Sequence, residues 1–289
     1  MRIFQSNISL LLGVALLISS ESWALDPSQV SNVTDVTTNQ VVATIPVGSE
    51  PNNVIVSPDN STVYVANKAS NTVSVINAAT NTVTFTFAAG KGPYSLGVSP
   101  DGSNLYVSNI SAGTVSVFNT TSKALVTTIP VKSDLGGLAV RPDGSQVYVV
   151  SGPGVSVIDT SSNKVSRTIH YPTKDYMAPL WVQFTPDGKD AYVLNVKGVT
   201  LIDAVTQKIT HRFIGIDRQS EATGMALCPL QNQLYVTDFA DVSIINTTTN
   251  KFESLTQLNQ TYFLGRPAVT PSGKNPLPPD YGSVRQESV

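Results

Sequence analysis

The sequence of 289 residues is poor in cysteine, histidine and charge. Its one cysteine, Cys228, cannot form a disulfide within the chain, and its apolar neighbours suggest a packed thiol on a buried strand. The only histidines are His170 and His211, which are too few to suggest a zinc, copper or haem site with histidine ligands. Charged residues make up 13% of the chain and the net charge is -2, so no basic surplus favours nucleic-acid binding.

Helical periodicity is also missing, and one apolar run stands out, at residues 8–18. It follows Met1 and Arg2 and precedes Ser22, Trp23 and Ala24. A basic start, an apolar run and small residues are typical of a secretory signal peptide. The run is shorter than the roughly 20 residues that a bilayer span needs. We expect residues 1–24 to be a signal peptide cleaved after Ala24 and the protein to be periplasmic, secreted or at the cell surface, without a membrane span. An N-terminal membrane anchor is the alternative.

What the sequence has in abundance is an internal repeat of about 42 residues, a sign of a solenoid, propeller or array. Its first marker resembles Val-Ser-Pro-Asp-Gly and occurs at 56–60, 98–102, 140–144, 184–188 and, in altered form, 227–231 and 269–273. The prolines of this marker are 42, 42, 44, 43 and 42 residues apart. A second marker centres on Tyr-Val, and a third resembles Val-Ser-Val-Ile-Asn. The three markers keep step along the chain.

Each repeat contains four short segments of β-branched and aromatic residues, separated by turn-forming residues. In the first complete unit we expect strands at 53–57, 62–66, 72–77 and 82–88. Pro-Asp-Gly after the first strand predicts a tight turn, and Asn81 is suited to a left-handed turn position. Because one four-stranded sheet cannot bury both faces, radial packing of sheets is expected, which is an all-β propeller. A β-helix is the alternative.

The ends of the repeat predict how the ring closes. Residues 31–40 match the third strand of the unit and 41–46 the fourth, whereas residues 266–270 match a first strand. We therefore expect six blades: five complete ones, and a composite blade closed by the N-terminal strands. Pro276, Pro278 and Pro279 interrupt the next strand. The propeller is expected over 25–274, followed by an irregular or disordered tail, 275–289.

Pro-Asp-Gly, Tyr-Val-x-Asn at 64–67 and 106–109, and Val-Ser-Val-Ile-Asn together resemble the YVTN-repeat family of β-propellers. Looser copies lie at 192–195 and 235–238, and the resemblance covers about 31–273. It implies an exported or cell-surface protein of bacterial or archaeal type. Members are commonly seven-bladed, so seven blades are the alternative to six for this chain. Members often lack an assigned activity. DNA binding is known for one member.

Candidate ligand contacts lie where the first strands begin, at the mouth of the central channel. The aligned column there reads Asn53, Ser95, Gly137, Trp181, Gly224 and Arg266. It is not a set of metal ligands, so no metal or cofactor is expected. Trp181 and Arg266 suit an anionic or planar ligand, which they would hold by stacking and paired donors. The alternative is that Trp181 fills the inner core. The tentative ligand contacts are Trp181, Arg266, Tyr94, Asn53, Tyr176 and Glu221.

These features favour an exported, non-catalytic scaffold that binds a protein or a small ligand. The first alternative is a lactonase-like or lyase-like enzyme, or an accessory subunit of a periplasmic dehydrogenase. Polar residues at the mouth would then carry the chemistry, and the sequence offers Arg266, Glu221, Asp217 and Lys174. The second alternative is a DNA-binding propeller, against which the scattered basic residues argue.

Overall fold

The computed structural model of the chain is built of β-strands. The residues it describes are 10–11, 14–17, 30–35, 40–132, 134–152, 154–171, 179–196, 198–214, 222–228, 231–237 and 241–257. Within these ranges, no helix has the length and apolar character needed to cross a membrane.

The strands form six four-stranded sheets, which we number as blades in chain order. Blade one holds β1 (Leu10–Leu11), β2 (Val14–Leu17), β3 (Val30–Asp35) and β4 (Gln40–Pro46). Blade two holds β5 (Pro51–Val56), β6 (Thr62–Asn67), β7 (Thr72–Asn77) and β8 (Thr82–Ala88). Blade three holds β9 (Pro93–Val98), β10 (Asn104–Asn109), β11 (Thr114–Asn119) and β12 (Leu125–Pro130).

The second half of the chain continues the same pattern. Blade four holds β13 (Leu135–Val140), β14 (Gln146–Ser151), β15 (Gly154–Asp159) and β16 (Lys164–His170). Blade five holds β17 (Pro179–Phe184), β18 (Asp190–Asn195), β19 (Gly198–Asp203) and β20 (Lys208–Ile214). Blade six holds β21 (Gly224–Cys228), β22 (Gln233–Thr237), β23 (Asp241–Asn246) and β24 (Lys251–Gln257).

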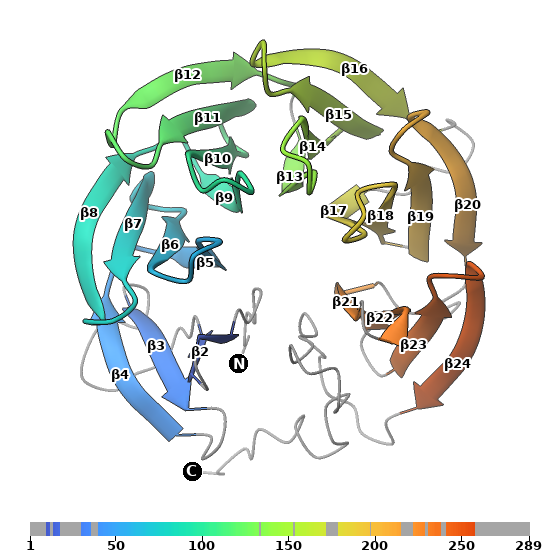
Figure 1. The fold of residues 1–289 in the computed structure, drawn as a ribbon, viewed down its shortest axis with the longest axis horizontal. Coiled ribbons are helices and arrows are strands. Elements are labelled where there is room, and N and C mark those ends of the chain that lie inside the picture. Colours follow the sequence, from blue (N-terminus) through green and yellow to red (C-terminus); the bar gives the residue numbers. More distant parts are fainter. Residues whose placement is uncertain are drawn as a thin grey trace.

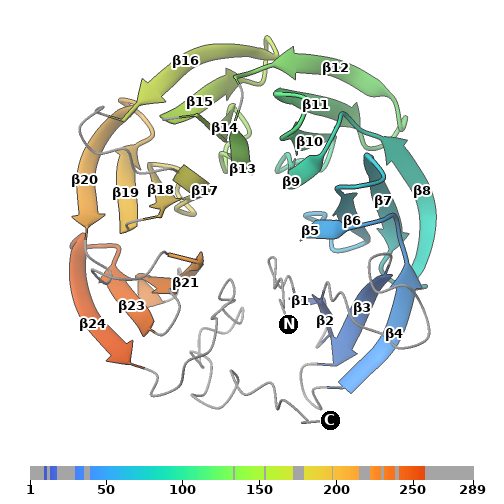
Figure 2. The ribbon, with the colours of Figure 1, turned by 180° about the vertical axis from the view of Figure 1, so that it is seen from behind.

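The six blades follow one another around a ring (Figure 1). Every sheet is an antiparallel meander in which each strand pairs with the next along the chain. The first strands β5, β9, β13, β17 and β21 lie innermost, and the fourth strands β8, β12, β16, β20 and β24 form the rim. The view from behind shows the same order (Figure 2). This radial arrangement confirms the propeller expectation rather than a β-helix.

The turns of blade two explain why its strands end where they do. Its observed strands, at 51–56, 62–67, 72–77 and 82–88, lie within two residues of the expected bounds. Gly102 and Gly144 take positive φ angles of 74° and 75° in the first turns of blades three and four, and Asn60 takes 60° in blade two. Asn81 adopts a φ of 54° in the last turn. Glycine and asparagine tolerate this left-handed region best, so the repeat of turn residues fixes the repeat of strands.

The core consists of clusters shared by neighbouring blades. Tyr64, Val75 and Phe87 of blade two pack with Leu96 and Leu105 of blade three, for example. The outer strand β8, in contrast, is exposed at six of its seven residues. Burial is therefore greatest on the middle strands, because both of their faces are covered by adjacent sheets. Cys228 on β21 is buried, as the sequence predicts.

Blade one takes its two inner strands from residues 10–17, inside the segment expected to be a signal peptide. β2 pairs with β3 from Val14 opposite Asp35 to Leu17 opposite Asn32. Without β2, the backbone N–H and C=O groups on the inner edge of β3 would have no strand partner. An apolar extended segment can supply these hydrogen bonds. The strand expected at 266–270 for this blade, and the tail 275–289, lie outside the described residues.

Candidate functional site

The polar side chains predicted at the channel mouth join neighbouring blades. The Leu96 amide donates to Oδ1 of Asn53 at 3.1 Å, linking blade three to blade two. One blade further, the Leu138 amide donates to Oγ of Ser95 at 3.0 Å. Asn53 and Ser95 are fully buried. These bonds satisfy backbone groups of the inner strands and give both residues a structural role, whereas Nδ2 of Asn53 is buried without a hydrogen-bond partner among the described residues.

The column changes character at blades four and five, where Gly137 faces Trp181. A Cβ atom on Gly137 would lie 2.5 Å from Cε3 of Trp181. Trp181 is 7% exposed and also packs with Met225 and Leu227 of blade six. The missing side chain of Gly137 therefore makes room for the indole. This packing agrees with the core-filling interpretation of Trp181.

Tyr94 is the described candidate that is most open to solvent. It is half-buried on β9 of blade three, and its ring meets that of Trp181 edge-on, with centroids 6.4 Å apart. Aromatic side chains from blades three and five thus meet toward the middle of the ring. The candidates Tyr176, Glu221 and Arg266 lie outside the described residues, as do Lys174 and Asp217.

Three asparagines of the Tyr-Val-x-Asn motif are buried at the ends of their second strands. Nδ2 of Asn67 donates to Oγ of Ser74 at 2.9 Å, and Asn109 makes the same bond to Ser116. Nδ2 of Asn195 donates to Oγ1 of Thr200 at 3.0 Å. A side chain on Gly48 or Gly90 would collide with the asparagine beneath it. These asparagines therefore lock the second strand to the third.

The repeated aspartates belong to the first turn of each blade. Hydrogen bonds from Ser57 and Ser61 lower the pKa of Asp59 to about 2. Hydrogen bonds from Ser99 and Ser103 likewise lower the pKa of Asp101. A general acid needs a raised pKa, so these carboxylates are suited to the turn rather than to proton donation. This confirms the sequence interpretation of the motif.

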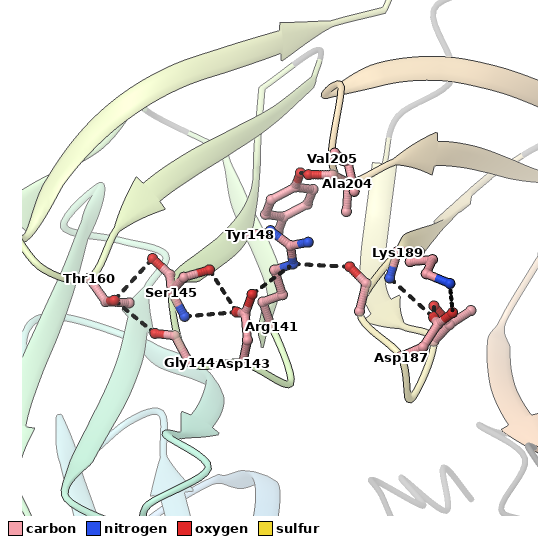
Figure 3. Close-up of polar contacts among 12 residues, drawn as sticks. Arg141, Asp143, Gly144, Ser145, Tyr148, Thr160, Asp187, Lys189, Ala204 and Val205 are labelled. Carbon is pink, nitrogen blue, oxygen red and sulfur yellow. Dashed lines mark hydrogen bonds and ion pairs between the residues drawn. The ribbon is translucent and has the colours of Figure 1, made fainter.

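The first turns of blades four and five are tied together, as Figure 3 shows. Nε of Arg141 donates to the Gly188 carbonyl at 3.0 Å and lies 3.5 Å from the Asp143 carboxylate. The Tyr148 hydroxyl donates to the Ala204 carbonyl of blade five at 3.5 Å. Burial raises the pKa of Tyr148 to about 12, and the charges of Arg141 and Arg167 oppose that rise. The hydrogen bonds of Arg141 and Tyr148 therefore join blade four to blade five.

The described residues line two grooves between blades. One, of about 450 Å³, lies between the first turns of blades three and four and includes Asp101, Asp143 and Tyr106. The other, of about 720 Å³, lies at the rim between β16 and β20. Both histidines, His170 and His211, line this rim groove. As expected, the two histidines occupy different register positions on their strands. The sequence did not indicate that adjacent blades bring them to one groove.

The described residues contain no group of three or more histidine, cysteine, aspartate or glutamate side chains placed to hold a metal ion. Three positively charged residues, Arg167, Lys208 and Arg212, also line the rim groove. Such a groove can bind anions.

Comparison with known proteins agrees with the fold. Residues 21–132, which include β3 to β12, match the family model described as "Lactonase, 7-bladed beta-propeller". Hydrazine synthase from Kuenenia stuttgartiensis is similar at 26% identity and a TM-score of 0.68, over 76% of this chain and 69% of that chain. Comparison with curated proteins gives no match. In all, 1686 chains of solved structures match, so the likeness does not by itself select a function. Together with the ring of sheets, these likenesses show that the chain is a β-propeller.

Proposed function

We propose that the protein is an exported, non-catalytic propeller with YVTN-type repeats, which serves as a scaffold for a protein or small ligand. The observation that carries this proposal is the use of inner polar groups in the fold. Asn53 and Ser95 join blades through buried hydrogen bonds. The turn aspartates are held ionised by neighbouring hydroxyl groups. Oδ1 of Asn53, the Ser95 hydroxyl and the turn aspartates thus have structural roles.

Ligand contact at the channel face falls to residues that break the repeat. Tyr94 and Trp181 form an aromatic pair there, and Arg266, Tyr176 and Glu221 remain predicted ligand contacts. An aromatic surface beside a guanidinium is suited to a planar anion. The channel face is therefore the first binding surface to test.

The test uses anilinonaphthalene sulfonate, a planar fluorescent anion. Replacing Tyr94 by alanine should weaken dye binding about tenfold, which corresponds to about 1.4 kcal/mol. Phe85→Ala, which removes an aromatic ring 38% exposed on the rim strand β8, is the matched control and should leave binding unchanged. Equal losses in the two variants would place the dye elsewhere and contradict the channel-face proposal.

A second candidate function is lactone hydrolysis, which the family match over 21–132 favours. Titration of the acid released from δ-gluconolactone and γ-butyrolactone at constant pH decides between the two. The scaffold proposal predicts no hydrolysis above the rate without protein. Turnover that is lost in Arg266→Gln or Glu221→Gln would overturn it and establish the enzyme.

A further inference from the structure

Among the described rim strands, β16 and β20 carry most of the positive charge, and β24 adds Lys251. The rim strands β4, β8 and β12 contain no charged residue. β16 carries Lys164, Arg167 and His170, and the next rim strand, β20, carries Lys208, His211 and Arg212. In Figure 1 these two strands follow each other along the rim. The basic residues therefore form one arc on a protein whose net charge is -2.

The two arginines face the same space between blades four and five. Arg167 pairs with Val157, which packs in the cluster shared by these blades, and antiparallel partners point to the same face. Arg212 pairs with Thr200, two residues from Ile202 of the same cluster. Burial raises the pKa of Tyr171, which follows β16, and the charge of Arg212 opposes that rise. Both guanidinium groups therefore belong to the rim groove.

The groove between these strands suits an extended anionic ligand. Its volume is about 720 Å³, and no carboxylate is among the described residues that line it. Thr168 and Thr210 are also among the residues that line it, and the Thr210 hydroxyl donates to the Leu201 carbonyl at 3.4 Å. Asp203, opposite Lys208 in the sheet, offsets part of the lysine charge, so the arginines contribute most.

We propose that this rim groove binds an acidic polysaccharide, with guanidinium groups on its carboxylates. Arg167 and Arg212 reach the groove from neighbouring rim strands, so they can bind separate carboxylates of one extended polymer. Arginine binds carboxylates in a bidentate manner, which adds geometric preference to charge. The site lies at the rim and does not depend on the channel-face proposal.

The test is electrophoresis of the full chain through native gels containing polygalacturonate. Retardation gives the affinity. The double variant Arg167→Gln/Lys208→Gln removes two exposed cations and should weaken binding at least about tenfold.

The matched control is Lys251→Gln/Lys189→Gln. Lys251 begins the rim strand of blade six at the register position of Lys208, and Lys189 lies in a turn. This pair removes the same charge and should change binding less than about twofold. Thermal unfolding of each variant checks that both remain folded.

Further arms identify the ligand class. Dextran, a neutral polysaccharide, should cause no retardation, and sodium chloride should weaken retardation by polygalacturonate because salt screens exposed charges. Three results would overturn the proposal: no binding of polygalacturonate, equal loss in the control pair, or duplex DNA or inorganic phosphate bound at least as tightly. None of these depends on whether the channel face binds a dye or the protein hydrolyses a lactone.

Discussion

At the scale of single residues, the inner column shows how one position takes different roles around the ring. Asn53 and Ser95 hold backbone amides of the next blade, whereas Gly137 leaves room for Trp181. The repeat sets the position of each residue within its blade. The residue that it contacts in the next blade determines whether it forms a hydrogen bond or packs against an apolar side chain. Contact between blades therefore has to be tested by changing residues in pairs.

Gly137 and Trp181 provide the sharpest such pair. Gly137→Ala should lower the free energy of unfolding by about 1–3 kcal/mol, because the new methyl group overlaps the indole. In a Trp181→Leu background the same change should cost much less, since the six-membered ring is gone. Urea unfolding of the four proteins gives the coupling. Equal costs in both backgrounds would contradict the packing described for Trp181.

Asp59 predicts a pH dependence of stability. Its pKa is lowered from 3.8 to about 2 by hydrogen bonds from Ser57 and Ser61. A lowered pKa in the folded state means that this carboxylate stabilises the fold above pH about 4, and that the contribution is lost as the pH falls through about 2. The melting temperature of Asp59→Asn should therefore lie below that of the natural protein at pH 7.

The difference in melting temperature should close between pH 4 and pH 2. Ser57→Ala, which removes the largest cause of the shift, should raise the pKa of Asp59 toward 3.8, as measured by carbon NMR of the carboxyl group. A gap between Asp59→Asn and the natural protein that stays constant down to pH 2 would rule out this linkage.

At the scale of elements, the inner strands are connected from blade to blade by side chains. Asn53→Ala leaves the buried Leu96 amide without its acceptor and should destabilise the protein by about 1–3 kcal/mol in urea unfolding. Asn104→Ala is the control, because Nδ2 of Asn104 donates only to the neighbouring Ser103 at 3.0 Å. A loss no greater than that of the control would show that the bond between blades contributes little.

The strands themselves could be predicted closely from the sequence. Alternation, the Pro-Asp-Gly turn and Asn81 act within a blade, so one repeat contains the information for its own four strands. Which rim residues meet could not be predicted in the same way. His170 and His211 occupy different register positions, and only the sideways packing of blades four and five brings them to one groove. The unequal charge of the fourth strands was the available signal.

At the scale of the whole molecule, the sequence predicted six blades and the described residues form six sheets. The inner strands of blade one come from residues 10–17, inside the expected signal peptide, and the inner strand predicted at 266–270 lies outside the described residues. The candidate site fared differently. Asn53 and Trp181 are buried in contacts between blades, and only Tyr94 of the described candidates is half-exposed. When one repeat is considered alone, a residue at the channel mouth is exposed to solvent. The side chains that bury it belong to the neighbouring blade, which is formed by another repeat. The rim, which no neighbour covers, is where surface charge shows most directly.

Hydrogen–deuterium exchange of the full chain, with and without polygalacturonate, tests most directly the claim that recognition lies where the repeat is broken. Amides on the outer edge of a rim strand have no strand partner, so a bound polymer should slow their exchange. Protection is predicted in peptides covering β16 and β20, with none in β8 and β12, whose sequences are uncharged. Equal protection around the rim, or protection confined to β8 and β12, would contradict the account.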